Sequence, residues 1–161
     1  MTKAEPTAYS ILFVCTGNTC RSPLAEVLAR MSLERRGWSH VKVDSAGAAA
    51  AWDAPASEGS LQAAADVGLD LSGHRSQPLT RELVANADII LAMTPSLLLE
   101  VETSGGEGKA SLLTEFINGE GAGEPIPDPI GSPPDVYAEV RDQISRAIEG
   151  LLDRLSAILA P

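Results

Sequence analysis

The sequence has few residues that form disulfides or bind metals. Its 161 residues include two cysteines, Cys15 and Cys20, and two histidines. Two cysteines in one short stretch give no disulfide framework, which is typical of a reducing compartment. The histidines are far apart and no cysteine follows Cys20, so the sequence offers no metal site. We therefore expect neither a metal nor another cofactor.

Long apolar runs and excess positive charge are also lacking. No apolar run approaches the roughly 20 residues that span a bilayer, and residues 1–9 lack the apolar core of a signal peptide. Acidic residues outnumber basic ones by 22 to 12, which gives a formal net charge of −10. Nucleic acids and anionic membranes bind basic surfaces, so we expect neither as a partner. These absences predict a cytoplasmic protein.

The remaining composition is that of an ordinary globular domain. Hydrophobic residues make up 44% of the chain and charged residues 21%, and the length suffices for one sizeable core. No repeat, linker or second domain is visible. We expect a single, monomeric domain over residues 10–161, preceded by a polar extension at 1–9.

The order of apolar segments predicts an α/β fold. Apolar or alternating runs indicate four strands, at residues 11–14, 41–44, 87–93 and 111–113. Helical spacing indicates helices at residues 24–33, 60–67, 80–86, 95–101 and 134–159. Turn-forming residues indicate loops at residues 45–59, 69–78, 103–109 and 115–132. Strands that alternate with helices form a doubly wound, four-stranded parallel sheet with helices on both faces.

The stretch from Ile11 to Glu26 has the pattern of a buried strand, a tight loop and a helix start. Ser22 suits the N-cap of that helix and Pro23 its first turn. A loop that leads into a helix N-terminus directs backbone N–H groups and the helix dipole at one point, which makes an anion site. Cys15 and Arg21 stand at the two ends of this loop, so the site offers a sulfur nucleophile and a guanidinium beside a bound oxyanion.

Each of these features has an ordinary interpretation when taken singly. A cysteine that ends a buried strand is usually an inert core residue, and an arginine near a helix start is usually solvated. The combination C-x5-R-S on a strand, loop and helix favours the anion site. The G-x-x-x-x-G-K-S/T loop of nucleotide-binding proteins is excluded because no lysine precedes Ser22.

The segment CTGNTCRSP, residues 15–23, resembles the active-site loop of the low-molecular-weight protein tyrosine phosphatase family. The likeness continues through nearly the whole chain from Ile11. It includes the blocks 43–47 and 87–93, His74, Leu79-Thr80, and Asp128-Pro129 within IPDPIG.

The resemblance implies a cysteine-dependent protein phosphatase that acts on phosphorylated proteins. The helix N-terminus and Arg21 favour the thiolate of Cys15, which attacks phosphorus and forms a phospho-cysteine intermediate. Backbone N–H groups and the Arg21 fork hold the equatorial oxygens. Ser22 hydrogen-bonds the sulfur and helps it leave. The phosphate-binding residues expected in the loop are Thr16, Gly17, Asn18, Thr19, Cys20 and Ser22.

Further roles follow from the resemblance. Asp128 is the expected general acid and base, although Asp-Pro is also a common turn opener. Ser45 and His74, with Asn18, are expected to support the loop, although a histidine in such a polar segment is often simply exposed. Asp135 is expected to cap the last helix.

Three positions bear on substrate choice. Tyrosine-directed members generally carry an aliphatic residue where Thr19 stands and aromatics where Ile130-Gly131 follow Asp128-Pro129. The combination here resembles the bacterial protein arginine phosphatase branch, in which a threonine occupies that loop position. A hydroxyl suits a donor-rich guanidine, although Thr for Ile is also a mild, near-isosteric change. Trp52 either forms one wall of the cleft or packs on the sheet edge.

Other functions stay open. A tyrosine phosphatase would use the same machinery. Arsenate reductases share a similar loop but use further downstream cysteines, which this chain lacks. A reductase that draws its electrons from a small thiol stays open. A phosphate-binding adaptor would be expected to have lost Cys15, Arg21 or Asp128. A disulfide between Cys15 and Cys20 under oxidation is a further hypothesis.

Overall fold

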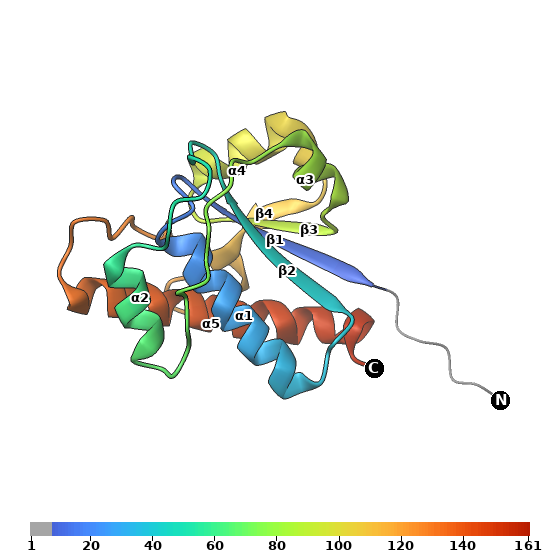
Figure 1. Ribbon diagram of the computed structural model, residues 1–161. Coiled ribbons are helices and arrows are strands. Elements are labelled where there is room, and N and C mark those ends of the chain that lie inside the picture. The colour runs from blue at the N-terminus through green and yellow to red at the C-terminus, as the bar shows by residue number, and fades with distance from the viewer. Residues whose placement is uncertain (1–7) are drawn as a thin grey trace.

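The computed structural model describes residues 8–161 and has three layers, a parallel sheet between two sets of helices (Figure 1). The sheet order is β2-β1-β3-β4. The strands are β1 (Tyr9–Cys15), β2 (Val41–Gly47), β3 (Ile89–Ala92) and β4 (Ala110–Leu112). The α-helices are α1 (Arg21–Arg36), α2 (Glu58–Ala65), α3 (Arg81–Asn86), α4 (Pro95–Val101) and α5 (Pro134–Leu159). Short π and 3-10 turns cover Glu102–Gly106 and Leu113–Phe116.

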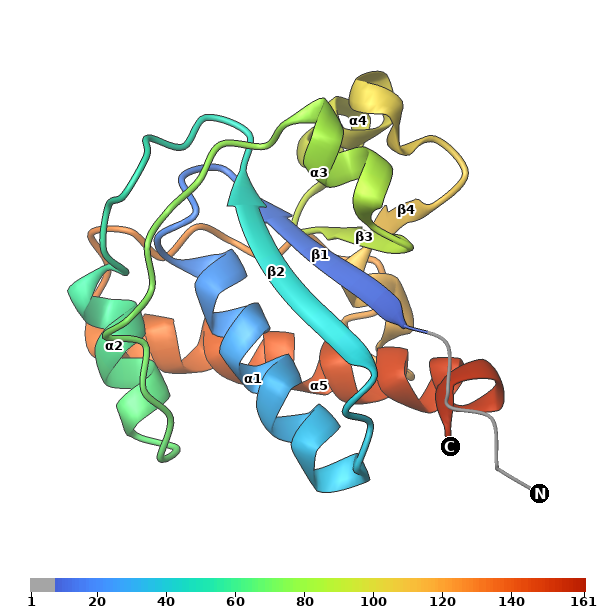
Figure 2. The same ribbon diagram turned by 45° about the vertical axis from the view of Figure 1, so that its right-hand side comes forward.

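Helices α1, α2 and α5 cover one face of the sheet, and α3 and α4 cover the other (Figure 2). The residues of β1 alternate between these faces: Ile11 and Phe13 join the larger core with α1 and α5, while Leu12 and Val14 join the smaller one. A strand buried on both faces explains the continuous apolar run in the sequence. The predicted doubly wound fold is confirmed.

The first strand begins two residues before its predicted start at Ile11. Residues 1–7 of the predicted extension lie outside the described residues. Tyr9 belongs to β1 and pairs with Val41, so the strand begins before Ile11. None of the helices within residues 8–161 combines the length and apolarity needed to cross a bilayer.

Two predicted helix caps are wrong. Cys20, not Ser22, is the N-cap of α1, and no side chain caps this helix. Ser22 lies inside the helix, and its hydroxyl contacts the sulfur of Cys15. The N-cap of α5 is Pro133, and Asp135 lies in the first turn, where its charge still suits the helix dipole.

Other boundaries shift by smaller amounts. The predicted loop at 103–109 begins with a π turn that extends α4 to Gly106. In α5 the predicted apolar stripe is buried along its middle, but the stripe ends at Leu159, since Ile158 is 70% exposed. Tyr137 is buried in place of Val136, which is only half-buried.

The loop that follows β1 lies at the carboxyl edge of the sheet. Cys15 ends β1 beside Gly47, the last residue of β2. On the other side, Met93 N–H donates to the Val14 carbonyl, and Ile126 N–H donates to the Met93 carbonyl. This ladder brings the segment that carries Asp128 next to the loop, although it is more than a hundred residues away in sequence.

Candidate active site

The loop of residues 15–21, here called the cysteine loop, turns its carbonyl groups outward. All but one of the carbonyls from Cys15 to Cys20 accept hydrogen bonds of 2.7–3.0 Å from outside the loop. The acceptors Cys15, Thr16, Asn18, Thr19 and Cys20 are bound by Ala48, Ala49, His74, Ser57 and Ser60 respectively. A loop whose carbonyls face outward directs its N–H groups to the centre, and this arrangement binds anions. The N-terminus of α1 adds its dipole.

Asn18 fixes the shape of the cysteine loop. It is fully buried and adopts a left-handed conformation with φ +57°. Its side-chain nitrogen donates to the hydroxyls of Ser22 (2.8 Å) and Ser45 (2.9 Å). Its side-chain oxygen accepts from the backbone N–H of Gln77 (2.9 Å). These three bonds hold a conformation that few side chains adopt readily.

His74 supports the same residue from outside. Its Nε2 lies 2.7 Å from the Asn18 carbonyl oxygen. A carbonyl oxygen only accepts, so Nε2 carries the proton. Ser45, which is buried, contacts the Asn18 side chain. The structure therefore brings together the support residues that the resemblance implied.

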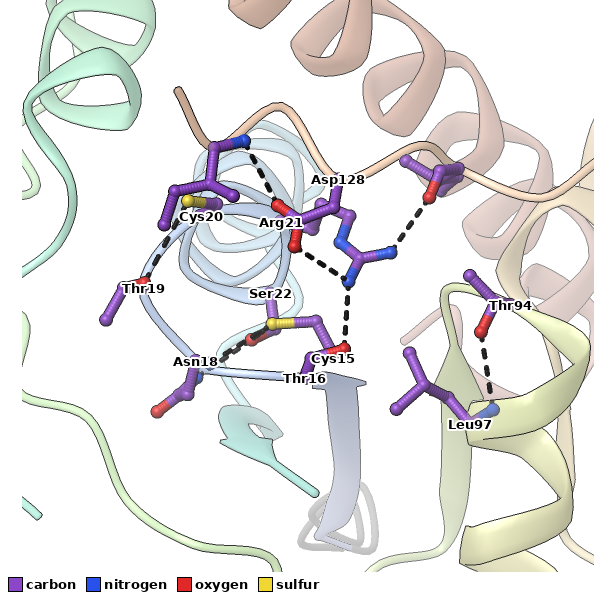
Figure 3. A network of polar contacts seen from close by, with 12 residues as sticks. Cys15, Thr16, Asn18, Thr19, Cys20, Arg21, Ser22, Thr94, Leu97 and Asp128 are labelled. Atoms are coloured by element: carbon purple, nitrogen blue, oxygen red, sulfur yellow. Dashed lines mark hydrogen bonds and ion pairs between the residues drawn. The ribbon is translucent and has the colours of Figure 1, made fainter. Parts of the chain in front are cut away.

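Cys15 is 2% exposed at the bottom of the loop. Its sulfur lies 2.9 Å from Ser22 Oγ and accepts from Asn18 N–H at 3.3 Å (Figure 3). Hydrogen bonds to a sulfur stabilise its thiolate form. The sulfur of Cys15 is thus held facing the centre of the loop.

Arg21 is buried and connects the cysteine loop to the segment that carries Asp128. One terminal nitrogen donates to the Ile126 carbonyl (2.9 Å), and the other donates to Thr16 Oγ1 (3.2 Å). Its Nε is buried and has no partner among the described residues. An oxyanion in the cysteine loop would supply the missing acceptor for such a group.

Asp128 lies across the Arg21 guanidinium from Cys15 (Figure 3). One carboxylate oxygen is 3.9 Å from Arg21, and the other accepts from Ile130 N–H at 3.1 Å. The side chain is 45% exposed, so it can exchange protons with water. A thiol, a guanidinium and a carboxyl group therefore converge on the cysteine loop.

Cys20 faces away from this centre. Its sulfur lies 3.2 Å from Ser57 Oγ and 3.7 Å from the Tyr137 hydroxyl, and both cysteines are free. Burial raises the pKa of Tyr137, so its phenol stays protonated beside the sulfur. The hypothetical disulfide with Cys15 would require Cys20 to leave these partners.

The three positions expected to bear on substrate choice are all at least partly exposed. Thr19 is half-buried in the cysteine loop, and its carbonyl is bound by Ser57 at the N-cap of α2. Trp52 is 66% exposed and Ile130 is 64% exposed. Packing of Trp52 on the sheet edge does not fit that exposure.

The structure adds residues that the sequence interpretation missed. Glu26 accepts from Ser45 Oγ at 2.7 Å, and a Cβ on Gly47 would lie 2.5 Å from the Thr16 carbonyl oxygen. The spacing of Ser22, Glu26 and Arg30 at i, i+4 and i+8 puts them on one face of α1 and was the available signal for Glu26. No sequence signal pointed to Gln77. Within residues 8–161, no group of three or more His, Cys, Asp or Glu side chains is arranged to hold a metal.

Comparison with known proteins gives consistent matches. The sequence model of the family described as low molecular weight phosphotyrosine protein phosphatase matches residues 10–159. The protein-arginine-phosphatase of Bacillus subtilis is 37% identical over 147 residues, which cover 90% of this chain and 95% of that protein. The low molecular weight protein-tyrosine-phosphatase Etp of Escherichia coli K12 is 37% identical over 149 residues, covering 91% and 95%.

A solved structure is also similar. It is a mutant of the YwlE arginine phosphatase with a phosphorylated active-site serine, 35% identical, with a TM-score of 0.82. The match covers 91% of this chain and 95% of that one.

Proposed function

Since this chain belongs to the low molecular weight phosphotyrosine protein phosphatase family and is a phosphoprotein phosphatase, we propose that it hydrolyses phosphoarginine on proteins through a phospho-cysteine intermediate. The observation that carries the catalytic part is the convergence of Cys15, Arg21 and Asp128 on one anion site. The substrate preference rests on Thr19 and on the absence of aromatic residues directly after Asp128-Pro129.

In the first step the Cys15 thiolate attacks phosphorus. The P–N bond to the arginine guanidine breaks, and Asp128 donates a proton to the leaving nitrogen. The N–H groups of the cysteine loop and the Arg21 fork stabilise the charge that spreads over the equatorial oxygens. The phosphoryl group is then covalently bound to the sulfur of Cys15.

In the second step a water molecule attacks the phospho-cysteine. The carboxylate of Asp128 accepts a proton from this water, and the P–S bond breaks. The sulfur leaves as a thiolate that accepts a hydrogen bond from Ser22. Inorganic phosphate is released and the free enzyme is regenerated.

Thr19 supports the phosphoarginine preference. Its side chain is half-buried in the loop, and a hydroxyl there can accept from a guanidine N–H. A phenol ring would favour aromatic walls, and Ile130 stands at one position where such a wall would be expected. The relatives do not separate the substrates, because the arginine and tyrosine phosphatases are equally identical to this chain.

The test compares a phosphoarginine peptide with a phosphotyrosine peptide of otherwise identical sequence, on the wild type and on Thr19→Ile. We expect the wild type to prefer phosphoarginine. Thr19→Ile should reduce kcat/KM for phosphoarginine by about 10-fold or more while phosphotyrosine hydrolysis is kept or increased. Thr103→Ile, the same change at an exposed position of the π turn, should alter neither rate.

The proposal would be contradicted if the wild type preferred phosphotyrosine and Thr19→Ile left this preference unchanged. The chain would then be a tyrosine phosphatase. Cys15→Ser should abolish turnover of both peptides. If the wild type hydrolyses neither, the remaining candidate is arsenate reduction with a small thiol as the electron donor.

A further inference from the structure

A line of hydrogen bonds leads from Cys15 away from the substrate side to the protein surface. It passes through Ser22, Asn18 and Ser45 and ends at a pair of charged residues on α1. The distances along it are 2.9 Å (Cys15–Ser22), 2.8 Å (Ser22–Asn18), 2.9 Å (Asn18–Ser45), 2.7 Å (Ser45–Glu26) and 2.6 Å (Glu26–Arg30).

At the surface end of this line, Glu26 determines which atom donates in the bond between Ser45 and Glu26. The Glu26 side chain is 14% exposed, and Arg30 binds one of its oxygens at 2.6 Å. An ionised carboxylate only accepts, so the Ser45 hydroxyl must donate its one proton to the other oxygen. The oxygen of Ser45 is then left as an acceptor.

The same constraint passes through Asn18. Gln77 N–H donates to the Asn18 side-chain oxygen, which favours the same amide orientation that the acceptor oxygen of Ser45 requires. Both protons of the Asn18 amide nitrogen are therefore available, one for Ser45 and one for Ser22. Ser22 Oγ accepts one of them, and its own proton lies toward the Cys15 sulfur.

We propose that Glu26, held by Arg30, is a positioning residue that orients this line so that Ser22 donates its proton to the sulfur of Cys15. Glu26 contacts neither the substrate nor the sulfur, and it acts through three intervening side chains. The proposal rests on the proposed phospho-cysteine chemistry, in which the sulfur is negatively charged before attack and again on leaving.

Without the Glu26 carboxylate, the hydrogen bonds of this line can still form, but nothing at its surface end requires the Ser45 hydroxyl to donate outward. Glu26 and Ser45 border a surface hollow of about 380 Å³, which water can enter. A water in place of the carboxylate can donate to Ser45 as readily as accept from it. A Ser45 hydroxyl that turns its proton toward Asn18 meets an amide nitrogen that cannot accept it, so the amide orientation then depends on Gln77 alone and the bond from Asn18 to Ser22 is weakened. The Ser22 proton then spends less time on the sulfur, and the thiolate is less stabilised.

The experiment measures the pH dependence of Cys15 alkylation by iodoacetate in wild type, Glu26→Ala, Ser22→Ala and the double variant, with the alkylated residue identified by mass spectrometry. Glu26→Ala should move the midpoint of the profile to higher pH by about one unit, a tenfold change. In Ser22→Ala the same change should have almost no further effect, because the line is already cut beside the sulfur.

Turnover provides a second measurement. Pre-steady-state hydrolysis of p-nitrophenyl phosphate separates formation of the phospho-cysteine from its breakdown. Glu26→Ala should slow the breakdown about tenfold, because the sulfur is then a poorer leaving group. Glu26→Gln should change both measurements in the same direction by less, because its amide can still accept from Ser45 in one of its two orientations. It also serves if Glu26→Ala does not fold.

The protein contains a matched control. Glu149 accepts from Ser32 Oγ at 2.6 Å and from Arg36 at 2.9 Å, which repeats the Ser–Glu–Arg arrangement between α1 and α5 without a link to Cys15. Glu149→Ala should leave the alkylation profile and the breakdown rate unchanged.

Two results would overturn the proposal: an unchanged profile in both Glu26 variants, or an effect of Glu26→Ala that persists in full in the Ser22→Ala background. Failure of the phospho-cysteine chemistry looks different, because the wild type would then hydrolyse no phosphorylated substrate, whereas a phosphotyrosine preference would change the substrate alone. The alkylation profile would still decide the role of Glu26.

Discussion

At the scale of single residues, Arg21 serves more than one purpose. In the proposed mechanism its guanidinium clamps an anion in the cysteine loop, and in the structure it donates to Thr16 in that loop and to Ile126 on the segment that carries Asp128. The planar fork can make these bonds at the same time, in fixed directions. One buried side chain therefore sets the distance between the anion site and the carboxyl group.

We predict that Arg21→Lys reduces kcat/KM by about 100-fold or more, although the charge is kept. A lysine offers one nitrogen and cannot bind the anion, Thr16 and the Ile126 carbonyl in the same geometry. Steady-state kinetics with a phosphorylated peptide measures the loss. Arg36→Lys, at a surface ion pair with Glu149 and Asp153, is the control and should keep full activity. Near wild-type activity in the Arg21→Lys variant would show that charge alone suffices.

At the scale of elements, the cysteine loop packs directly against Gly47 at the end of β2. Gly47 approaches the loop so closely that an added Cβ would lie 2.5 Å from Thr16 O and 2.8 Å from Asn18 N. Gly47 also bonds the Gln77–Leu79 segment through its N–H and carbonyl. The strand end therefore shapes the loop through backbone contact.

We predict that Gly47→Ala lowers kcat at least about tenfold, since a misplacement of about 1 Å in a positioned site has effects of this size or larger. Both contacted atoms belong to backbone, so relief requires the loop itself to move. Stopped-flow kinetics and thermal melting would measure activity and stability together. Gly73→Ala is the matched control, because a Cβ there meets nothing within 4 Å. Wild-type kcat in Gly47→Ala would mean that the loop tolerates the shift.

At the scale of the whole molecule, charge opposes the function. The net charge of −10 repels anionic substrates at long range, so binding depends on the local field of the cysteine loop, the α1 N-terminus and Arg21. Selection among phosphorylated proteins should therefore depend on the charge of the residues around the phosphorylated side chain.

We predict that a phosphopeptide flanked by lysines has a higher kcat/KM than one flanked by glutamates, by about tenfold at low salt. The ratio should shrink as ionic strength rises from about 10 mM to about 100 mM, which shortens the Debye length from roughly 30 Å to roughly 10 Å. Kinetics on the two peptides at both salt concentrations tests this. A ratio that is independent of salt would assign the preference to direct contacts instead.

The sequence by itself determined the order of the elements and the chemistry of the cysteine loop. Hydrophobic periodicity is local, so β1, α1 and the long α5 could be predicted from neighbouring residues. The loop motif is also local, since Cys15 and Arg21 lie six positions apart in one strand-loop-helix unit. The resemblance to a phosphatase family extended this to Asp128, which no local pattern distinguishes from the other acidic residues.

Only the tertiary structure decided how the site is held. Three features join segments that are distant in sequence: the close approach of Gly47 to the cysteine loop, the bond from Arg21 to the Ile126 carbonyl, and the hydrogen bonds from Ser22 to Glu26. The hydrophobic pattern of the sequence does not indicate which of these groups will meet. The cap of α1 shows the same limit. Local propensity favoured Ser22 as the N-cap, but its hydroxyl serves the sulfur of Cys15 because folding places the strand end against the first turn of the helix.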